Sequence, residues 1–252
     1  MFLRSVIAFA LASSAATVSM AQMAAPLAVP VGEPSAKVDL MTADGIAAFK
    51  AQWRYSDVKI IETTNTLPGP DRNMPGPEAK TYDISPRAGE ANFDDSGWQV
   101  IAPESLKDRR AAGKICFNWF RINLTMPEAV NGVDVAGMTA VLHCTVDDYA
   151  EVWVNGVLPR SLTSPSPNLV QGFNVPNRVT IVQEVTPGEK IQIAIFGING
   201  PISAAPTNYI FFRDARIEFH PKAQAAAPSQ PTPSESTSIA TGSPAPESRE
   251  VH

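Results

Sequence analysis

The chain has 252 residues, a formal net charge of −5 and a pI of about 5.3. Its lysines and arginines form no basic stripe, so the sequence does not favour a nucleic-acid partner. Its three histidines and two cysteines lack the spacing of a zinc site. No serine-hydrolase or zinc-protease motif occurs either, so the sequence shows no nucleophile or metal set for those enzymes.

The first 21 residues have the features of a secretory signal peptide. Arg4 precedes the apolar segment "VIAFALASSAAT", and small residues occupy the cleavage positions before Gln22. That segment is too short for a stable span, and no other apolar run reaches the ~18 residues that a membrane helix requires. We therefore expect cleavage after Ala21, a periplasmic or secreted protein and no membrane span. A retained helical anchor is the alternative.

Residues 42–53, beyond an expected flexible leader at 22–37, form the one stretch with helical periodicity. Thr42 or Asp44 can cap this helix, and large apolar residues recur at helical spacing as far as Trp53. Downstream, the sequence predicts an extended segment, a loop containing four prolines and a short strand, at residues 55–64, 67–80 and 81–86.

From Lys114 onward the sequence is dominated by short segments rich in β-branched and aromatic residues, separated by turn formers. These predicted strands cover residues 114–126, 138–146, 149–154, 177–185, 190–198 and 209–219. Short strands at this spacing, with no helical pattern between them, indicate an antiparallel β-sandwich or barrel. We predict one all-β domain over residues 38–220, with a short helix near its N-terminus.

Residues 221–252 are rich in proline, serine, alanine and threonine and almost free of large apolar side chains. Such a segment cannot bury enough surface to offset the entropy lost on ordering. The sequence therefore predicts a disordered tail.

Side-chain alternation in "DDYAEVWVNG" (147–156) separates two faces of one strand. Ala150 and Val152 belong to an apolar face, as do the isoleucines of "KIQIAIF" in a later strand. The opposite face carries Tyr149, Glu151 and Trp153. That face is therefore either half covered by a loop or available to a ligand. Asn155-Gly156 then predicts a type I′ turn.

Four motifs in this order resemble a known family: "FDDSGW" (93–98), "NWFRINLTMP" (118–127), "DDYAEVWVNG" and "VTPGEKIQIAIFGING" (185–200). Together they resemble the galactose-binding-domain-like jelly roll that accompanies β-galactosidase-type glycoside hydrolases. They are most similar to the N-terminal domain of secreted bacterial gluconolactonase-type proteins. The resemblance covers about residues 50–220. The catalytic propeller of gluconolactonases is therefore expected to be missing from this sequence.

The resemblance implies a sugar site made of an aromatic platform and a few polar groups, and it also implies a structural calcium ion whose ligands the sequence does not identify. Each aromatic candidate has core packing as its alternative role. The candidates for the sugar site are Tyr149, Glu151, Trp153, Arg160, Asn199, Asn208 and Tyr209.

Arg121 and its surroundings give a second set of expectations. Arg121 lies in an apolar strand and therefore requires a carboxylate partner, for which we expect Asp147 or Asp148. With Glu151 these acids invite a glycosidase interpretation, but alternation places Asp147 and Asp148 on opposite faces. His143 lies within a strand, where a structural histidine is the simpler interpretation.

Cys116 and Cys144 admit two interpretations. Export permits a disulfide, and the two strands that carry them can bring them together. A free cysteine is also an ordinary small core residue. The sequence leaves both open.

Three functions follow from these observations. The first is a non-catalytic module that binds a carbohydrate or glycoconjugate. The second is an accessory domain or remnant of a lactonase or glycoside hydrolase. The third is a structural module that docks onto another exported protein.

Overall fold

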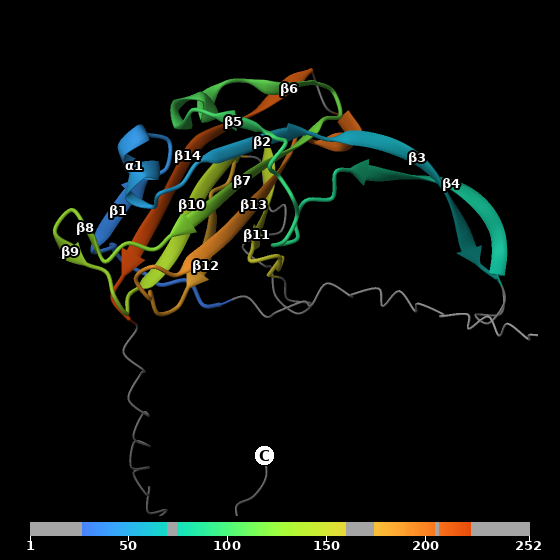
Figure 1. Ribbon diagram of the computed structural model, residues 1–252. Helices are drawn as coiled ribbons and strands as arrows, with labels where there is room; N and C mark the ends of the chain where they lie inside the picture. Colours follow the sequence, from blue (N-terminus) through green and yellow to red (C-terminus); the bar gives the residue numbers. More distant parts are fainter. Residues whose placement is uncertain (1–26, 70–74, 160–173, 205–206, 223–252) are drawn as a thin grey trace, which may run out of the picture. The chain divides into compact units, whose positions relative to one another are not determined.

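Two antiparallel β-sheets form most of the computed structural model, which describes residues 27–69, 75–159, 174–204 and 207–222 (Figure 1). Their inward faces enclose one apolar core. The predicted fold class, an all-β antiparallel sandwich with a short N-terminal helix, is confirmed.

The first sheet contains five strands, with the last strand of the chain near its centre. Their order is β1 (Ala36–Asp39), β14 (Asn208–His220), β10 (Thr139–Asp147) and β12 (Asn177–Val182), and β6 (Arg110–Gly113) also pairs with β14.

The second sheet also contains five strands. Their order is β11 (Tyr149–Val154), β13 (Lys190–Ile198), β7 (Phe117–Thr125), β2 (Trp53–Asp57) and β5 (Gln99–Ile101). The other elements in the described residues are two hairpins and three short helices: β3 (Lys59–Pro68) with β4 (Pro75–Ser85), β8 (Ala129–Val130) with β9 (Val133–Asp134), α1 (Ala43–Ala48), η1 (Pro103–Lys107) and η2 (Ile202–Ala204).

Alternation along the strands produces the core. Ala150 and Val152 of β11 are buried between the sheets, as are Ile191, Ile193 and Ile195 of β13. The predicted inward faces of both strands are therefore confirmed. Trp53 is fully buried among them, and its indole Nε1 donates to Leu40 O at 3.0 Å.

The helix and the proline-rich segment differ from the sequence prediction. Thr42 caps α1 as expected, but the helix ends at Ala48 and Trp53 begins β2 instead. Residues 75–80, predicted as loop, belong to β4. Proline is tolerated there because β4 is an edge strand, where a missing N–H leaves no ladder bond broken.

The Asn155-Gly156 turn is present, with φ of 48° and 79° at its two central residues. Val154 and Val157 exchange backbone hydrogen bonds across it, at 2.8 and 2.9 Å. The chain does not continue as a paired return strand, because β11 pairs only with β13 within the described residues. The turn thus caps the end of β11 without starting a second ladder.

The expected signal peptide (1–21) lies outside the described residues. Of the expected tail (221–252), only the first two residues are described. Part of the expected leader is described. Residues 27–35, which we call the strap, contact the first sheet, and Ala36 begins β1. No helix in the described parts of the chain is long and apolar enough to cross a membrane.

Candidate functional site

The outer face of the second sheet carries a ladder of aromatic side chains. In the register of three adjacent strands, Glu151 lies opposite Phe196, and Phe196 lies opposite Trp119. Two residues further along β11, Trp153 lies opposite Ala194, and Ala194 lies opposite Arg121. These side chains all point away from the core. Trp119, Trp153, Ala194 and Phe196 belong to a second apolar cluster on the outside of the sandwich.

Residues 86–98, which we call the cover loop, pack against this outer face. Ala88 of the loop is fully buried in the outer cluster, and Phe93 and Trp98 pack on it with ring centroids 5.4 Å apart. Trp119 Nε1 donates to Pro86 O at 2.9 Å. The face is therefore half covered, one of the two possibilities that the alternation left open.

Arg121 holds the cover loop in place. Its side chain is 2% exposed, and its Nε donates to Asp95 Oδ2 at 2.8 Å. Its Nη1 donates to the carbonyl oxygens of Ala88 and, at 3.1 Å, of Glu90. The guanidinium also lies 5.4 Å from the centre of the Phe93 ring. One buried cation thus binds both the carboxylate and the backbone of the loop.

The predicted partner of Arg121 was wrong. We expected Asp147 or Asp148, but the carboxylate is that of Asp95. Arg121 alternates outward with Trp119, whereas Asp147 ends a strand of the other sheet and Asp148 follows it. Asp94 forms a local turn within "FDDSGW", since its Oδ1 accepts from Ser96 N at 2.9 Å.

Close backbone approaches define where the loop and the sheet meet. A Cβ at Gly89 would lie 2.6 Å from Trp153 Cδ2, so the loop backbone rests directly on the indole ring. A Cβ at Gly156 would lie 2.7 Å from Ala91 N. Glycine at both positions lets the loop touch Trp153 on one side and the β11 turn on the other.

A pocket of about 640 Å³ lies among the cover loop, the β11 turn and the outer face of the sheet. Its aromatic lining comes from Trp119, Trp153 and Phe196. Its polar lining comes from Arg87, Glu90, Asn92, Glu151 and Asn155. This volume falls within the range of small-molecule sites, which combine an apolar surface with a few orienting polar groups.

One atom beside the pocket has no hydrogen-bond partner among the described residues. Trp153 Nε1 is buried and unbonded, although a buried indole N–H normally finds an acceptor. Arg87, by contrast, is already paired with Asp83 of β4.

The structure brings together only part of the predicted site. Glu151 and Trp153 line the pocket, and Tyr149 lies on the same face, half-buried against Gly200. Arg160 lies outside the described residues. The two remaining asparagines and Tyr209 lie elsewhere.

Asn199 is fully buried and bonds the backbone. Its Nδ2 donates to the carbonyl oxygens of Gly113 and Lys114, at 2.8 and 2.9 Å. Tyr209 packs against Arg109, whose guanidinium lies 5.5 Å from its ring centre. Both arrangements join chain segments, and neither residue lines the pocket.

Asn208 contacts a buried carboxylate pair. Its Nδ2 donates to Asp147 Oδ1 at 3.4 Å and to Asp148 Oδ1 at 3.2 Å. The expectation that these acids point to opposite faces was therefore wrong, because they lie at the break between β10 and β11, where alternation does not apply. Arg213 pairs with Asp147, and Gly200 N donates to Asp148 Oδ2 at 3.0 Å.

Burial, and after it the neighbouring carboxyl of Asp147, raise the pKa of Asp148 to about 6. Asp148 is 1% exposed, and its bonds from Gly200 and Asn208 only partly oppose this effect. Through Asn208 and Arg213, the pair links the connection between the two sheets to β14. Neither acid lines the pocket beside the cover loop.

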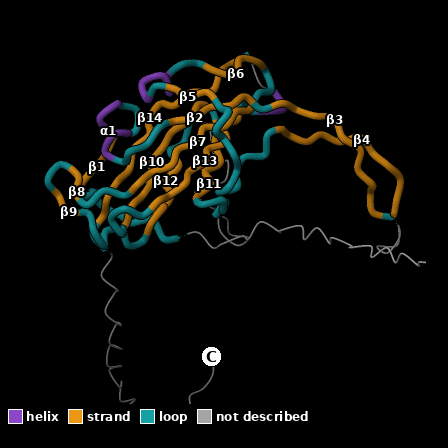
Figure 2. The backbone as a smooth tube through the Cα atoms, in the orientation of Figure 1, coloured by secondary structure: helices purple, strands orange, loops and turns teal. Residues whose placement is uncertain are grey.

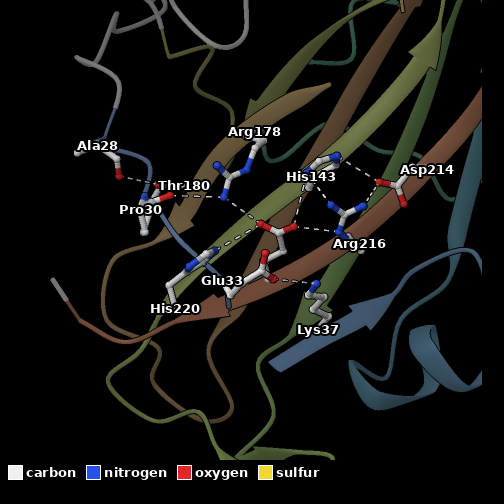
Figure 3. A network of polar contacts seen from close by, with 11 residues as sticks. Ala28, Pro30, Glu33, Lys37, His143, Arg178, Thr180, Asp214, Arg216 and His220 are labelled. Atoms are coloured by element: carbon white, nitrogen blue, oxygen red, sulfur yellow. Dashed lines mark hydrogen bonds and ion pairs between the residues drawn. The ribbon is translucent and has the colours of Figure 1, made fainter. Parts of the chain in front are cut away.

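A second polar network covers the outer face of the first sheet, around the buried carboxylate of Glu218 (Figure 3). Arg178 and Arg216 bond its two oxygens, at 3.0 and 2.9 Å. His220 Nε2 lies 3.4 Å from it. We call this set, with His143 and Asp214, the Glu218 network.

His143 has a structural environment within this network. Arg216 can only donate, so its 3.0 Å contact makes His143 Nδ1 the acceptor, and Nε2 then donates to Asp214 at 3.2 Å. Burial lowers the pKa of His143, and the charge of Arg216 lowers it further. The imidazole is therefore held neutral between fixed partners, as a structural histidine is.

The strap closes the Glu218 network from outside. Thr180 Oγ1 donates to Ala28 O at 2.9 Å, and Arg178 donates to Pro30 O at 3.4 Å (Figure 3). Ser35 N donates to Phe219 O at 2.8 Å. The carboxylates and guanidinium groups of the network thus have protein partners, whereas the buried Nδ1 of His220 has none among the described residues.

The pocket residues that the cover loop contributes were not predicted from the sequence. Glu90 and Asn92 belong to a segment without periodicity, and nothing local indicates that it folds back over β11. The aromatic pocket residues could have been predicted from side-chain alternation, because Trp119 and Phe196 point outward on their strands as Trp153 does.

Both cysteines are free thiols, so the disulfide alternative is not realised. Burial raises the pKa of Cys144 to about 12, which makes it an inert core residue. Within the described ranges, no three His, Cys, Asp or Glu side chains are grouped to hold a metal ion. The structural calcium ion implied by the resemblance stays a prediction.

Neither a protein-family model nor a curated protein matches this sequence. Solved structures with a similar fold include a glycosyl hydrolase family 2 member from Bacteroides cellulosilyticus, with a TM-score of 0.42 and 16% identity over 73% of this chain and 21% of that one. A β-glucuronidase from glycoside hydrolase family 2 has a TM-score of 0.42 and 14% identity, over 76% of this chain and 18% of that one.

The Faecalibacterium prausnitzii β-glucuronidase has a TM-score of 0.40 and 15% identity, over 77% of this chain and 33% of that one. This chain therefore spans a third or less of the length of these three structures. At such TM-scores the likenesses assign neither a ligand nor an activity. The gluconolactonase resemblance stays a prediction from the sequence motifs.

Proposed function

We propose that this protein is a non-catalytic carbohydrate- or glycoconjugate-binding module and that the sugar binds in the pocket beneath the cover loop. The observation that carries the proposal is the lining of that pocket: three aromatic side chains beside carboxylate and amide groups. A sugar ring offers apolar C–H surfaces for aromatic contact and hydroxyl groups for hydrogen bonds.

The proposed residues differ in their support. Glu151 and Trp153 keep the role that the sequence suggested, and Tyr149 extends the same face. Glu90 and Asn92 join them from the cover loop. Asn199, Asn208 and Tyr209 have structural partners and drop out of the proposed contact set.

A glycan array probed with the full-length protein tests the proposal. Trp153→Ala should weaken retention of the bound glycan at least tenfold, about 1.4 kcal/mol, because the platform is lost. Trp98→Ala is the matched control: the same side chain is removed from the outer cluster, but Trp98 does not line the pocket. It should retain binding.

Circular dichroism of each variant must show a folded sandwich. If Trp153→Ala fails to fold, Asn92→Ala replaces it, because this exposed loop residue lines the pocket and packs against nothing in the core. Equal loss of binding in Trp98→Ala and Trp153→Ala would contradict a site in this pocket, as would full binding by folded Trp153→Ala.

Glycoside or lactone hydrolysis is the second candidate. It is favoured by the two carboxylates, Glu90 and Glu151, that line the same pocket. We place it second because Glu90 is exposed, whereas a general acid usually owes its raised pKa to burial. We expect no turnover of aryl glycosides or gluconolactone, with or without calcium. Turnover that disappears in Glu151→Gln would reverse this order.

We also propose that the protein is exported to the periplasm or the medium. The proposal depends on residues 1–21, whose composition is that of a signal peptide. N-terminal sequencing of the protein purified from its host should begin at Gln22. A chain that begins at Met1 would contradict cleavage.

A further inference from the structure

The hairpin of β3 and β4 forms a sheet of its own. Its register runs from Lys59 opposite Ser85 to Pro68 opposite Pro75, and neither strand pairs with a third one among the described residues (Figure 2). An isolated two-stranded hairpin is at best marginally stable in water. A hairpin of this length therefore gains from a further partner.

The side chains of the hairpin are unusually exposed for their chemistry. Nine of the ten residues of β3 are exposed, including Ile60 at 47%, Ile61 at 43% and Leu67 at 44%. On β4, Tyr82 is 69% exposed. Several large apolar side chains on one exposed element are typical of an interaction surface.

The two free edges of the hairpin differ. The β4 edge begins with Pro75 and Pro77, which lack an N–H, and such prolines obstruct the addition of another strand. The β3 edge has no proline between Lys59 and Leu67 and is rich in isoleucine and threonine. A long, regular edge of this kind is a template for another strand. The β3 edge is the one open to pairing.

We propose that the β3 edge pairs antiparallel with β3 of a second copy of this chain, about a twofold axis at Thr63. In this register Thr63 faces its own equivalent, and cross-strand threonine pairs are favourable. Glu62 faces Thr64, and Lys59 faces Leu67. The only two charged residues of the strand therefore never meet a like charge, and the interface is self-complementary as a twofold requires.

This register explains the composition of the strand. Its middle is formed by the uncharged sequence "TTN", and its apolar residues lie toward the two ends, where Ile61 would face Asn65 and Ile60 would face Thr66. The product is a four-stranded sheet, beyond the two strands that are marginal alone. The proposal is independent of the pocket and of any sugar.

Sedimentation velocity of the full-length protein over a concentration series tests the proposal. Wild type should dimerise with rising concentration. Thr63→Lys places two lysines opposite each other at the axis and should weaken the dimer at least tenfold. Thr81→Lys is the matched control, because Thr81 faces Thr63 across the hairpin but lies on β4. It should dimerise as wild type does.

A mixing experiment separates pairing from misfolding. Thr63→Lys and Thr63→Glu should each be monomeric alone, and an equimolar mixture should form a heterodimer because lysine then faces glutamate. Both variants must show the wild-type circular dichroism spectrum. A wild type that stays monomeric at every concentration overturns the proposal, and the edge is then left to a different protein. A dimer that Thr63→Lys and Thr81→Lys weaken equally, or a mixture that stays monomeric, overturns it as well.

Discussion

The outer faces of the two sheets are built in opposite ways. On the first sheet, the ladder Arg178–His143–Arg216 surrounds Glu218, and the strap lies over it. On the second, an aromatic ladder lies under a loop that leaves a pocket of about 640 Å³. On the first face, charged side chains bind one another and the strap. The second keeps an indole N–H unbonded among the described residues.

This difference separates a structural cluster from a candidate binding site. The Glu218 network has the histidines and carboxylates that suggest catalysis, yet each of its charges is already bound by another protein group. The pocket has fewer charged groups and an uncompensated donor. Residue type alone would favour the first face, whereas the pocket and its aromatic lining favour the second.

The largest effect is expected for Arg121→Met, which tests how far the second face depends on one cation. Methionine fills the space, but Asp95 and the loop carbonyl oxygens lose their buried partner. The free energy of unfolding should fall by about 3 kcal/mol, as for a broken buried pair. Urea denaturation measures it. A loss below about 1 kcal/mol would show that Arg54, 3.5 Å from Asp95, holds the loop unaided.

Glu218→Gln makes the corresponding change on the first face. Its partners are charged, but Arg178 and Arg216 are about a third exposed, so water can solvate them once the carboxylate is gone. We expect a loss of about 2 kcal/mol. Glycan retention should not change. If retention falls with Glu218→Gln, the two faces are coupled and the contrast between them is wrong.

Asp148→Asn tests the passage from β10 to β11, which joins the two faces. Because the pKa of Asp148 is raised to about 6, its contribution to stability is present below pH 3.8 and is lost as the pH rises through about 6. The variant should therefore show a flatter decline over this window, by on the order of 1 kcal/mol. Urea melts from pH 3.5 to 7 measure it. An unchanged slope would assign the decline to other groups.

Thr180→Val should have the smallest effect and sharpens the role of the strap. The isosteric change removes only the bond to Ala28 O, so global stability should fall by about 0.5 kcal/mol. Hydrogen exchange should nevertheless show faster exchange of the strap amides. If exchange there is unchanged, the strap is held by Arg178 and Ser35 alone.

The sequence was sufficient for the long strands after Lys114 because their signal is local, whereas β1, β5 and β6 were not predicted. Phe117–Thr125, Tyr149–Val154 and Lys190–Ile198 alternate so regularly that strand, inward face and outward face could all be predicted. The same alternation predicted two of the pocket residues, Glu151 and Trp153, which share the outward face of their strand. Thr42 also caps α1 as its side-chain chemistry predicts.

The errors concern contacts between distant segments. Asp95 pairs with Arg121 because the cover loop folds back across the sheet, and alternation within one strand contains no information about that. Asp147 and Asp148 share Asn208 because a strand ends between them. The prolines of β4 were interpreted as loop signals, although an isolated edge tolerates them.

Arg121 binds the cover loop through carbonyl oxygens, which every residue type supplies identically. The side chains at positions 90, 91 and 92 are therefore not needed to keep the loop in place, whereas Gly89 and Asp95 are. Recognition and folding are thereby assigned to different atoms of the same segment. For directed evolution, this makes three adjacent positions beside the pocket available for recoding specificity on an unchanged scaffold.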